Sequence, residues 1–357
     1  MWFSTNDFTF NKTLKKEKIY GYVLPHAGTK YTNEIYIHTL QYIPQNTDFD
    51  NVYIFYYPAN ETENVTENNT SYFHEYYVPM KTLKHIFQNW WKINNKKFIG
   101  INVRDNTINM RKFNINNSLI IISADFSHFL SMQQAIQIEN KAALSLMFKT
   151  QHKTQQHVDH MKQFDYVFKR LPENCILKWI GRTRSPGEKG VGYLSFLITK
   201  QYEVKKKPNG YFITVYDEDL NARECLGKWE YENKKSVNNY LQDVIQLART
   251  TSRLTNGQNT DIPIKYYKIT YLYLDSSPFS RGYHGVKHNA FYLPEVFLEN
   301  TYENGKWIKN SDTQWNHSSH IFDMSETLSK LNVKAGINTN IQPQLYKSHV
   351  YYGSTNN

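Results

Sequence analysis

The chain has 357 residues and a formal net charge of +10, with 40% hydrophobic and 21% charged residues. These values are close to globular averages and exclude an intrinsically disordered chain, and the length favours two domains because single cores rarely exceed about 250–300 residues. Residues 1–200 carry 24 Lys and Arg against 16 Asp and Glu, a net charge of +8. This excess is compatible with a nucleic-acid partner and equally with an ordinary solvated surface.

Strand-like and helix-like segments alternate through residues 1–200. The hydrophobic spacing predicts strands at 18–24, 51–57, 98–103 and 118–123, helices at 31–42, 80–91, 131–148 and 157–170, a polar loop at 59–71 and an apolar segment at 190–199. Strands separated by helices are typical of an α/β domain with a mostly parallel sheet flanked by helices.

The pattern changes near residue 201. It predicts strands at 210–216 and 265–275, a turn and strand at 284–293, helices at 236–250 and 324–331, and a polar loop at 301–320. This pattern indicates a smaller α+β domain over residues 201–357, after a first domain over residues 1–200. The stretch of Lys, Pro and Gly at 204–210 marks the boundary.

Three residues in the first domain form a candidate site. His26 follows the first strand, and Asp125 and His128 follow the fourth. In open parallel sheets ligands bind beyond the carboxyl ends of the strands, and the i, i+3 spacing lets Asp125 and His128 face one crevice if the turn is helical. Imidazoles and carboxylates serve as metal ligands or as acid–base groups. The alternative is structural, with Asp125 as the N-cap of the following helix.

Two segments carry a resemblance to a known family. Segment 23–31, Val-Leu-Pro-His-Ala-Gly-Thr-Lys-Tyr, and segment 122–129, Ile-Ser-Ala-Asp-Phe-Ser-His-Phe, resemble the Pro-His-Ala-Gly-x-x-Tyr and Ser-Ser-Asp-Phe-x-His segments of the Memo family. Glu75 and Pro79 match its Glu-x-x-Leu-Pro segment, and Gly181-Arg182 its Cys-Gly-Arg segment. The resemblance spans about residues 18–200 and implies a fold like that of class III extradiol dioxygenases.

The resemblance also implies a pocket that binds iron or copper. The family's ligands are a His that matches His26, a His that falls at Asn60, and a Cys that falls at Ile180. Glu61 can replace one missing ligand, whereas Cys175 lies five residues short of the other. With His128 this gives His26, Glu61 and His128 as the candidate metal ligands in a degenerate pocket.

The second domain resembles the AMMECR family. Segment 222–227, Ala-Arg-Glu-Cys-Leu-Gly, is similar to its Leu-Arg-Gly-Cys-Ile-Gly hallmark, and segments 284–287 and 291–296 are similar to its His-Gly-Ile-x and Thr-Tyr-Leu-Pro-Glu-Val segments. Domains similar to Memo and AMMECR occur fused in this order in prokaryotes. Cys225 is either a small core residue or a nucleophile, and the neighbouring Glu224 disfavours a thiolate.

A glycine-rich segment, Gly187–Gly192, gives a second candidate site. If it precedes a helix N-terminus, it can hold an anion with the help of Arg182 and Arg184.

Cysteine use and hydropathy bound the compartment. With only two cysteines, no apolar core in Met1–Lys18 and no apolar run of about 18 residues, we expect a cytoplasmic protein without a membrane span.

The interpretation favoured by the missing ligands is a binding or regulatory protein for an unknown small molecule or protein. The alternatives are a metal-dependent oxidoreductase using non-haem iron or copper, with His26, Asp125 and His128 as catalytic groups, and a nucleic-acid-associated factor.

Overall fold

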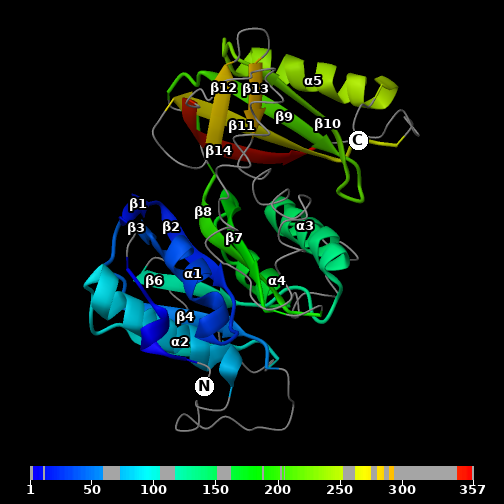
Figure 1. Cartoon of the computed structure of the whole chain (residues 1–357). Helices are drawn as coiled ribbons and strands as arrows, with labels where there is room; N and C mark the ends of the chain where they lie inside the picture. The colour runs from blue at the N-terminus through cyan, green and yellow to red at the C-terminus, as the bar shows by residue number, and fades with distance from the viewer. Residues whose placement is uncertain are drawn as a thin grey trace. The chain divides into compact units, whose positions relative to one another are not determined.

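The computed structural model divides the chain into two compact units (Figure 1). It describes residues 3–10, 13–58, 73–104, 117–150, 162–186, 189–201, 203–204, 206–251, 262–274, 280–284, 289–292 and 344–355. Among these, residues 3–143 and 162–200 belong to unit 1, and residues 144–150 and those from 201 onward belong to unit 2.

Unit 1 is built on a mixed six-stranded sheet. Its strands are β2 (Ile19–Leu24), β4 (Asn51–Tyr56), β5 (Lys97–Asn102), β6 (Ser118–Ser123), β7 (Cys175–Arg184) and β8 (Gly192–Lys200). In the spatial order β5–β4–β6–β2–β8–β7 the first four strands run parallel to one another. Strand β8 is antiparallel to both of its neighbours, β2 and β7. A short parallel pair, β1 (Lys15–Glu17) with β3 (Tyr42–Pro44), lies outside this sheet.

Helices cover both faces of this sheet. They are α1 (Thr29–Leu40), α2 (His74–Ile86), α3 (Met132–Phe148) and α4 (Lys162–Phe168), and Phe87–Trp91 continues α2 as a π-helix. In β4, Phe55 contacts Tyr166 of α4 and Tyr56 contacts Tyr76 of α2, each with ring centroids 5.7 Å apart. Successive residues of a strand point to opposite faces, so α4 and α2 lie on opposite faces. This confirms the predicted mixed α/β class for unit 1.

Unit 1 differs from the sequence prediction in several elements, beginning with the short strand β1, which was not predicted. Strand β7 was not predicted, because its buried Arg182 and Arg184 disguise an otherwise apolar run. Helix α2 begins at His74, not Met80, and contains Pro79, so the proline does not mark the start of the helix. Tyr42, predicted as the end of a helix, instead lies in β3. The predicted loop at 59–71 and the start of the predicted helix at 157–170 lie outside the described residues.

Within its described residues, unit 2 is an antiparallel sheet with one long helix. Its strands are β9 (Gly210–Tyr216), β10 (Ala222–Lys228), β11 (Tyr266–Leu274), β12 (Ser280–His284), β13 (Asn289–Tyr292) and β14 (Gln344–Ser354), in the order β10–β9–β11–β14–β12–β13. Helix α5 (Lys234–Thr251) packs its apolar face on β9 and β11 to form a core of Tyr211, Ile213, Val215, Val237, Leu241, Val244, Ile245, Ala248, Ile264, Ile269 and Tyr271.

Strands β10, β12 and β14 were not predicted in unit 2. In β10, Arg223 and Glu224 are buried within a strand, which composition alone does not indicate. The predicted loop at 301–320 and helix at 324–331 lie outside the described residues. Among the described helices of both units, none is long and apolar enough to cross a membrane.

Candidate functional site

The turn after β2 holds His26 at the carboxyl end of that strand. The backbone N–H of Ala124 donates to the carbonyl of Leu24 at 3.0 Å, and the Tyr36 hydroxyl of α1 donates to the carbonyl of Pro25 at 2.6 Å. These bonds fix the backbone just before His26. Because β2 and β6 are parallel neighbours, the residues that follow them lie at the same edge of the sheet.

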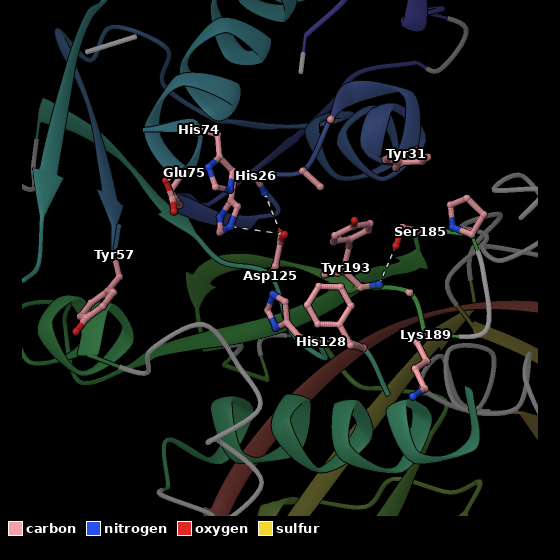
Figure 2. A pocket seen from close by; sticks show the side chains of 16 residues that line it. His26, Tyr31, Tyr57, His74, Glu75, Asp125, His128, Ser185, Lys189 and Tyr193 are labelled. Atoms are coloured by element: carbon pink, nitrogen blue, oxygen red, sulfur yellow. Dashed lines mark hydrogen bonds and ion pairs between the residues drawn. The ribbon is translucent and has the colours of Figure 1, made fainter. Parts of the chain in front are cut away.

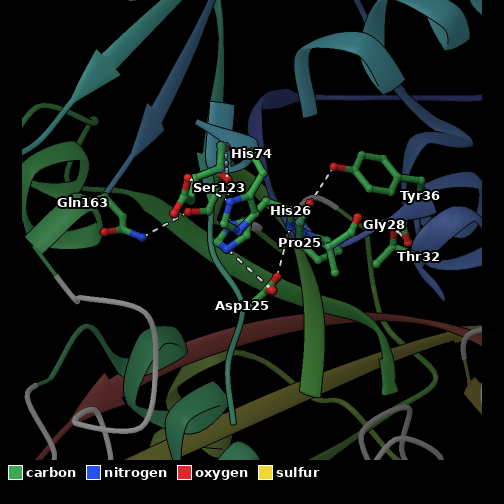
Figure 3. Close-up of polar contacts among 11 residues, drawn as sticks. Pro25, His26, Gly28, Thr32, Tyr36, His74, Ser123, Asp125 and Gln163 are labelled. Atoms are coloured by element: carbon green, nitrogen blue, oxygen red, sulfur yellow. Dashed lines mark hydrogen bonds and ion pairs between the residues drawn. The ribbon is translucent and has the colours of Figure 1, made fainter. Parts of the chain in front are cut away.

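His26 and Asp125 are in direct contact (Figure 3). The backbone N–H of His26 donates to Asp125 Oδ1 at 3.0 Å, and His26 Nε2 lies 3.5 Å from Asp125 Oδ2. Both residues are 5% exposed. A buried imidazole beside a buried carboxylate can hold or exchange a proton with a bound group. Asp125 is therefore engaged by His26 and is not the N-cap of α3, which begins at Met132.

The loop that carries His128 is extended. Phe126 donates its backbone N–H to the Gly192 carbonyl at 2.9 Å, and Gly192 donates to the Ser127 carbonyl at 2.8 Å. His128 then forms a β-bridge with Val191. The turn between residues 125 and 128 is therefore not helical, because this stretch pairs with residues 190–192 instead of with itself.

A buried ion pair lies beneath this loop. Arg182 of β7 donates through Nε and Nη2 to Glu139 Oε2 at 2.9 and 2.6 Å, and through Nη1 to Asn140 Oδ1 at 2.6 Å. The Ser127 hydroxyl donates to the other oxygen of the same carboxylate. Arg182 and Glu139 are each 2% exposed. Arg182 thus ties α3 and β7 to the loop that presents His128.

The structure does not bring Arg182 and Arg184, predicted to bind an anion, to the pocket described below. Arg184 is buried, and its Nη2 donates to the Leu130 carbonyl. Segment 187–192 does not meet the condition of preceding a helix N-terminus, because Gly192 begins strand β8, which pairs with β7. Residues 187 and 188 lie outside the described residues.

A pocket of about 540 Å³ opens at this edge of unit 1 (Figure 2). His26, Asp125 and His128 all line it, so the structure places the three predicted site residues together. The other lining residues come from the β2–α1 turn, α1, the residue after β4, the first turn of α2, the loop after β6, the β7–β8 connection and β8: Ala27, Gly28, Tyr31, Tyr57, His74, Glu75, Phe129, Ser185, Pro186, Lys189, Gly190, Val191 and Tyr193.

The pocket combines several ionisable groups with aromatic walls. The His74 ring meets the His26 ring edge-on with centroids 5.2 Å apart, and His74 Nδ1 lies 3.4 Å from Glu75 Oε2. Burial, and next the charge of Asp125, raise the pKa of Tyr193, so its hydroxyl stays protonated at neutral pH. The same two causes raise the pKa of Tyr36.

The metal ligands implied by the Memo resemblance do not form a complete set here. Ile180 is buried on β7 and has no donor atom, and Cys175 lies at the opposite end of β7 from the pocket-lining residues that follow Arg184. Glu61 lies outside the described residues. Among the residues that the structure describes, no group of three or more His, Cys, Asp or Glu side chains is arranged to hold a metal ion.

In unit 2, Cys225 lies on β10 opposite Thr214 of β9. The Thr214 hydroxyl donates to Cys225 Sγ at 3.2 Å, and the Cys225 backbone N–H donates to Glu224 Oε1 at 2.9 Å. Cys225 is half-buried rather than a fully buried core residue. Residues 285–288 and 293–300, which complete the segments similar to the AMMECR family, lie outside the described residues.

Sequence reasoning missed several residues of the pocket. His74, Tyr57, Lys189 and Tyr193 were not proposed as site residues. Tyr57 directly follows a parallel strand, β4, and the rule that places His26 at the site would also have found it. No local signal marks His74, because its approach to His26 depends on the packing of α2 against the sheet.

No model of a known protein family matches the chain, and no curated protein matches it.

Proposed function

We propose that unit 1 binds a small molecule through the His26–Asp125 pair, and that the chain acts as a binding or regulatory protein. The observation that carries this proposal is the buried contact between His26 and Asp125, with Nε2 3.5 Å from Oδ2, at the wall of a pocket of about 540 Å³. Small-molecule sites are usually concave pockets of about 300–1,000 Å³ with apolar walls and a few convergent polar groups.

The lining indicates what such a molecule has to offer. Tyr31, Tyr57 and Phe129 provide aromatic surface, and Phe129 is 68% exposed despite its large apolar ring. The polar groups of the lining include those of His26, Asp125, His128 and Lys189 (Figure 2). The ligand that fits these walls is small and partly apolar, and it carries at least one polar group that meets the His26–Asp125 pair.

Thermal-shift screening of the full chain tests this proposal. The probes are small alcohols, phenols, amines and carboxylic acids, followed by calorimetry on any compound that raises Tm. We expect His26→Ala to remove the shift, whereas His85→Gln, which lies outside the pocket lining, leaves it unchanged. Recovery of the compound unaltered after incubation supports binding without turnover. Equal shifts in wild type and His26→Ala would contradict the proposal.

A metal-dependent oxidoreductase is the second candidate. It is favoured by the presence of three imidazoles, those of His26, His74 and His128, and two carboxylates, those of Glu75 and Asp125, in the lining of one pocket. The resemblance to the Memo family points the same way, through iron or copper. Elemental analysis of untagged protein is the test: about one metal per chain, lost in His26→Ala, would support this candidate, and trace metal unchanged by that substitution would remove it.

A further inference from the structure

Ser123 joins His26 to helix α2. It is the last residue of β6 and fully buried. Its hydroxyl donates to the backbone carbonyl of Glu75 at 2.5 Å, and its Oγ lies 3.1 Å from His26 Nδ1. Gln163 of α4 donates to the carbonyl of Ser123 at 3.1 Å and holds the end of the strand in place (Figure 3). The hydroxyl therefore sits between a helix carbonyl and the candidate site.

Pro79 explains why a side chain donates to a carbonyl inside α2. In an α-helix the carbonyl of residue i accepts from the N–H of residue i+4, and for Glu75 that residue is Pro79. Proline has no N–H, so this helical bond cannot form. The Ser123 hydroxyl donates to the Glu75 carbonyl in its place.

The direction of these bonds places a hydrogen on Nδ1 of His26. A serine hydroxyl has one proton, and a carbonyl oxygen can only accept. Since the Ser123 proton points to the Glu75 carbonyl, Ser123 Oγ must accept from His26, so His26 Nδ1 carries a hydrogen. If Ser123 instead donated its proton to His26, Ser123 Oγ and the Glu75 carbonyl oxygen would lie 2.5 Å apart with no hydrogen between them. Two oxygens come this close only when a hydrogen bond joins them.

We propose that Ser123 is a positioning residue that holds neutral His26 in its Nδ1–H tautomer, with Pro79 setting the direction of the Ser123 hydroxyl. The neutral ring then presents the lone pair of Nε2 on the side of Asp125 Oδ2, 3.5 Å away. Both atoms are acceptors, so they suit a ligand group that donates a hydrogen bond, such as a hydroxyl or an amine. This last step rests on the proposed binding function, whereas the tautomer is a property of the free protein.

The test is nitrogen NMR of the full chain labelled with ¹⁵N-histidine, without ligand. Spectra are recorded at a pH about two units above the usual histidine pKa of about 6.5, where an unperturbed imidazole is neutral. Disappearance of one set of signals in His26→Gln assigns them to His26. We expect a protonated Nδ1 and an unprotonated Nε2. A protonated Nε2 in the wild-type protein would overturn the proposal, whether or not any small molecule binds.

Variants separate positioning from a general structural effect. Ser123→Ala should shift the His26 population toward the Nε2–H form, and Ser123→Thr, which keeps a hydroxyl, should restore the Nδ1–H form. Pro79→Ala restores a backbone N–H for the Glu75 carbonyl, so Ser123 can turn toward His26 and the Nε2–H form should rise. An unchanged His26 spectrum in Ser123→Ala would contradict the role of Ser123. An unchanged His26 spectrum in Pro79→Ala would contradict the role of Pro79.

Ser195→Ala is the matched control. Ser195 is another fully buried serine of the same sheet, and its hydroxyl accepts from Thr39 at 2.6 Å. We expect this variant to leave the His26 signals unchanged. A tautomer change of the same size in Ser195→Ala would show that loss of any buried hydroxyl perturbs the sheet, and would overturn the assignment to Ser123.

Discussion

In unit 1, β2 and β6 run parallel, and the residues that follow them place His26 and Asp125 at one edge of the sheet. In unit 2 every described strand pairing is antiparallel, and Cys225 lies within β10, where it meets Thr214 across the ladder. Parallel strands bring the loops that follow them to a common edge of the sheet. A residue in the middle of a strand instead has the neighbouring strands of its sheet on either side. This difference explains why sequence motifs in the first unit converge on a pocket.

The largest expected effect concerns buried charge in unit 1. Arg182→Ala leaves Glu139 buried without its guanidinium, and removing one partner of a buried ion pair costs about 3–5 kcal/mol. Urea unfolding of the full chain, followed for unit 1, measures this loss. The matched variant is Lys228→Ala in unit 2, which breaks an exposed pair with Glu232 and should change stability by less than about 1 kcal/mol. Equal losses of stability in Arg182→Ala and Lys228→Ala would contradict the expected difference between a buried and an exposed ion pair.

The core under α5 provides the second comparison. Leu241 is 6% exposed and packs on the sheet of unit 2, so Leu241→Ala should cost about 2–5 kcal/mol. Leu247 on the same helix is 37% exposed, and Leu247→Ala should cost less than about 0.5 kcal/mol. Denaturant midpoints of the two variants measure the difference. Similar losses would mean that α5 does not bury the face described here.

Substitution of one glycine in each unit compares how well the two units accommodate an added methyl group. A Cβ at Gly192 would lie 1.8 Å from Glu139 Oε1, an oxygen of the carboxylate that Arg182 holds, so Gly192→Ala should cost about 1–3 kcal/mol. A Cβ at Gly227 would lie 2.5 Å from the Phe212 ring, which is half-buried and can turn aside. Gly227→Ala should therefore cost less than Gly192→Ala. Thermal unfolding of both variants tests the order, and the reverse order would contradict it.

The smallest expected effect is a pH dependence from His85 on α2. Its ring packs against those of Phe3, Phe8 and Phe10, and burial lowers its pKa. The unfolded chain then binds the proton more tightly than the folded chain, so stability falls as the pH drops through the unfolded value of about 6.5. His85→Gln should reduce this pH slope by less than one proton. If the pH dependence of stability were the same in His85→Gln and in the wild type, the assigned contribution of His85 would be contradicted.

The sequence predicted the strands well where apolar residues dominate, as in β6 and β9. It missed β7 and β10, where buried charged residues such as Arg182 and Glu224 interrupt the pattern. The partner that neutralises Arg182 is Glu139, on a helix 43 residues away, and no local pattern reveals that pairing. Buried charge is thus the physical reason why these strands escaped prediction.

Only part of the candidate site could be predicted from the sequence. His26, Asp125 and His128 follow strands, and the rule for parallel sheets places them together. Ser123 contacts α2 through the Glu75 carbonyl, and His74 reaches His26 through the packing of α2 against the sheet, and spacing along the chain reveals neither contact. The extended path from Asp125 to His128 depends on pairing with residues 190–192, so the correct neighbourhood was predicted with the wrong local backbone.

The most direct test of the central claim is the dissociation constant of the strongest-binding small molecule from the probe panel, measured by calorimetry for wild type and Asp125→Asn. Hydrogen bonds to charged groups contribute about 1.5–3 kcal/mol, so we predict a loss of affinity of about tenfold or more. His85→Gln should bind as the wild type does. Equal dissociation constants for wild type and Asp125→Asn would contradict the account of the His26–Asp125 pair as the recognition element.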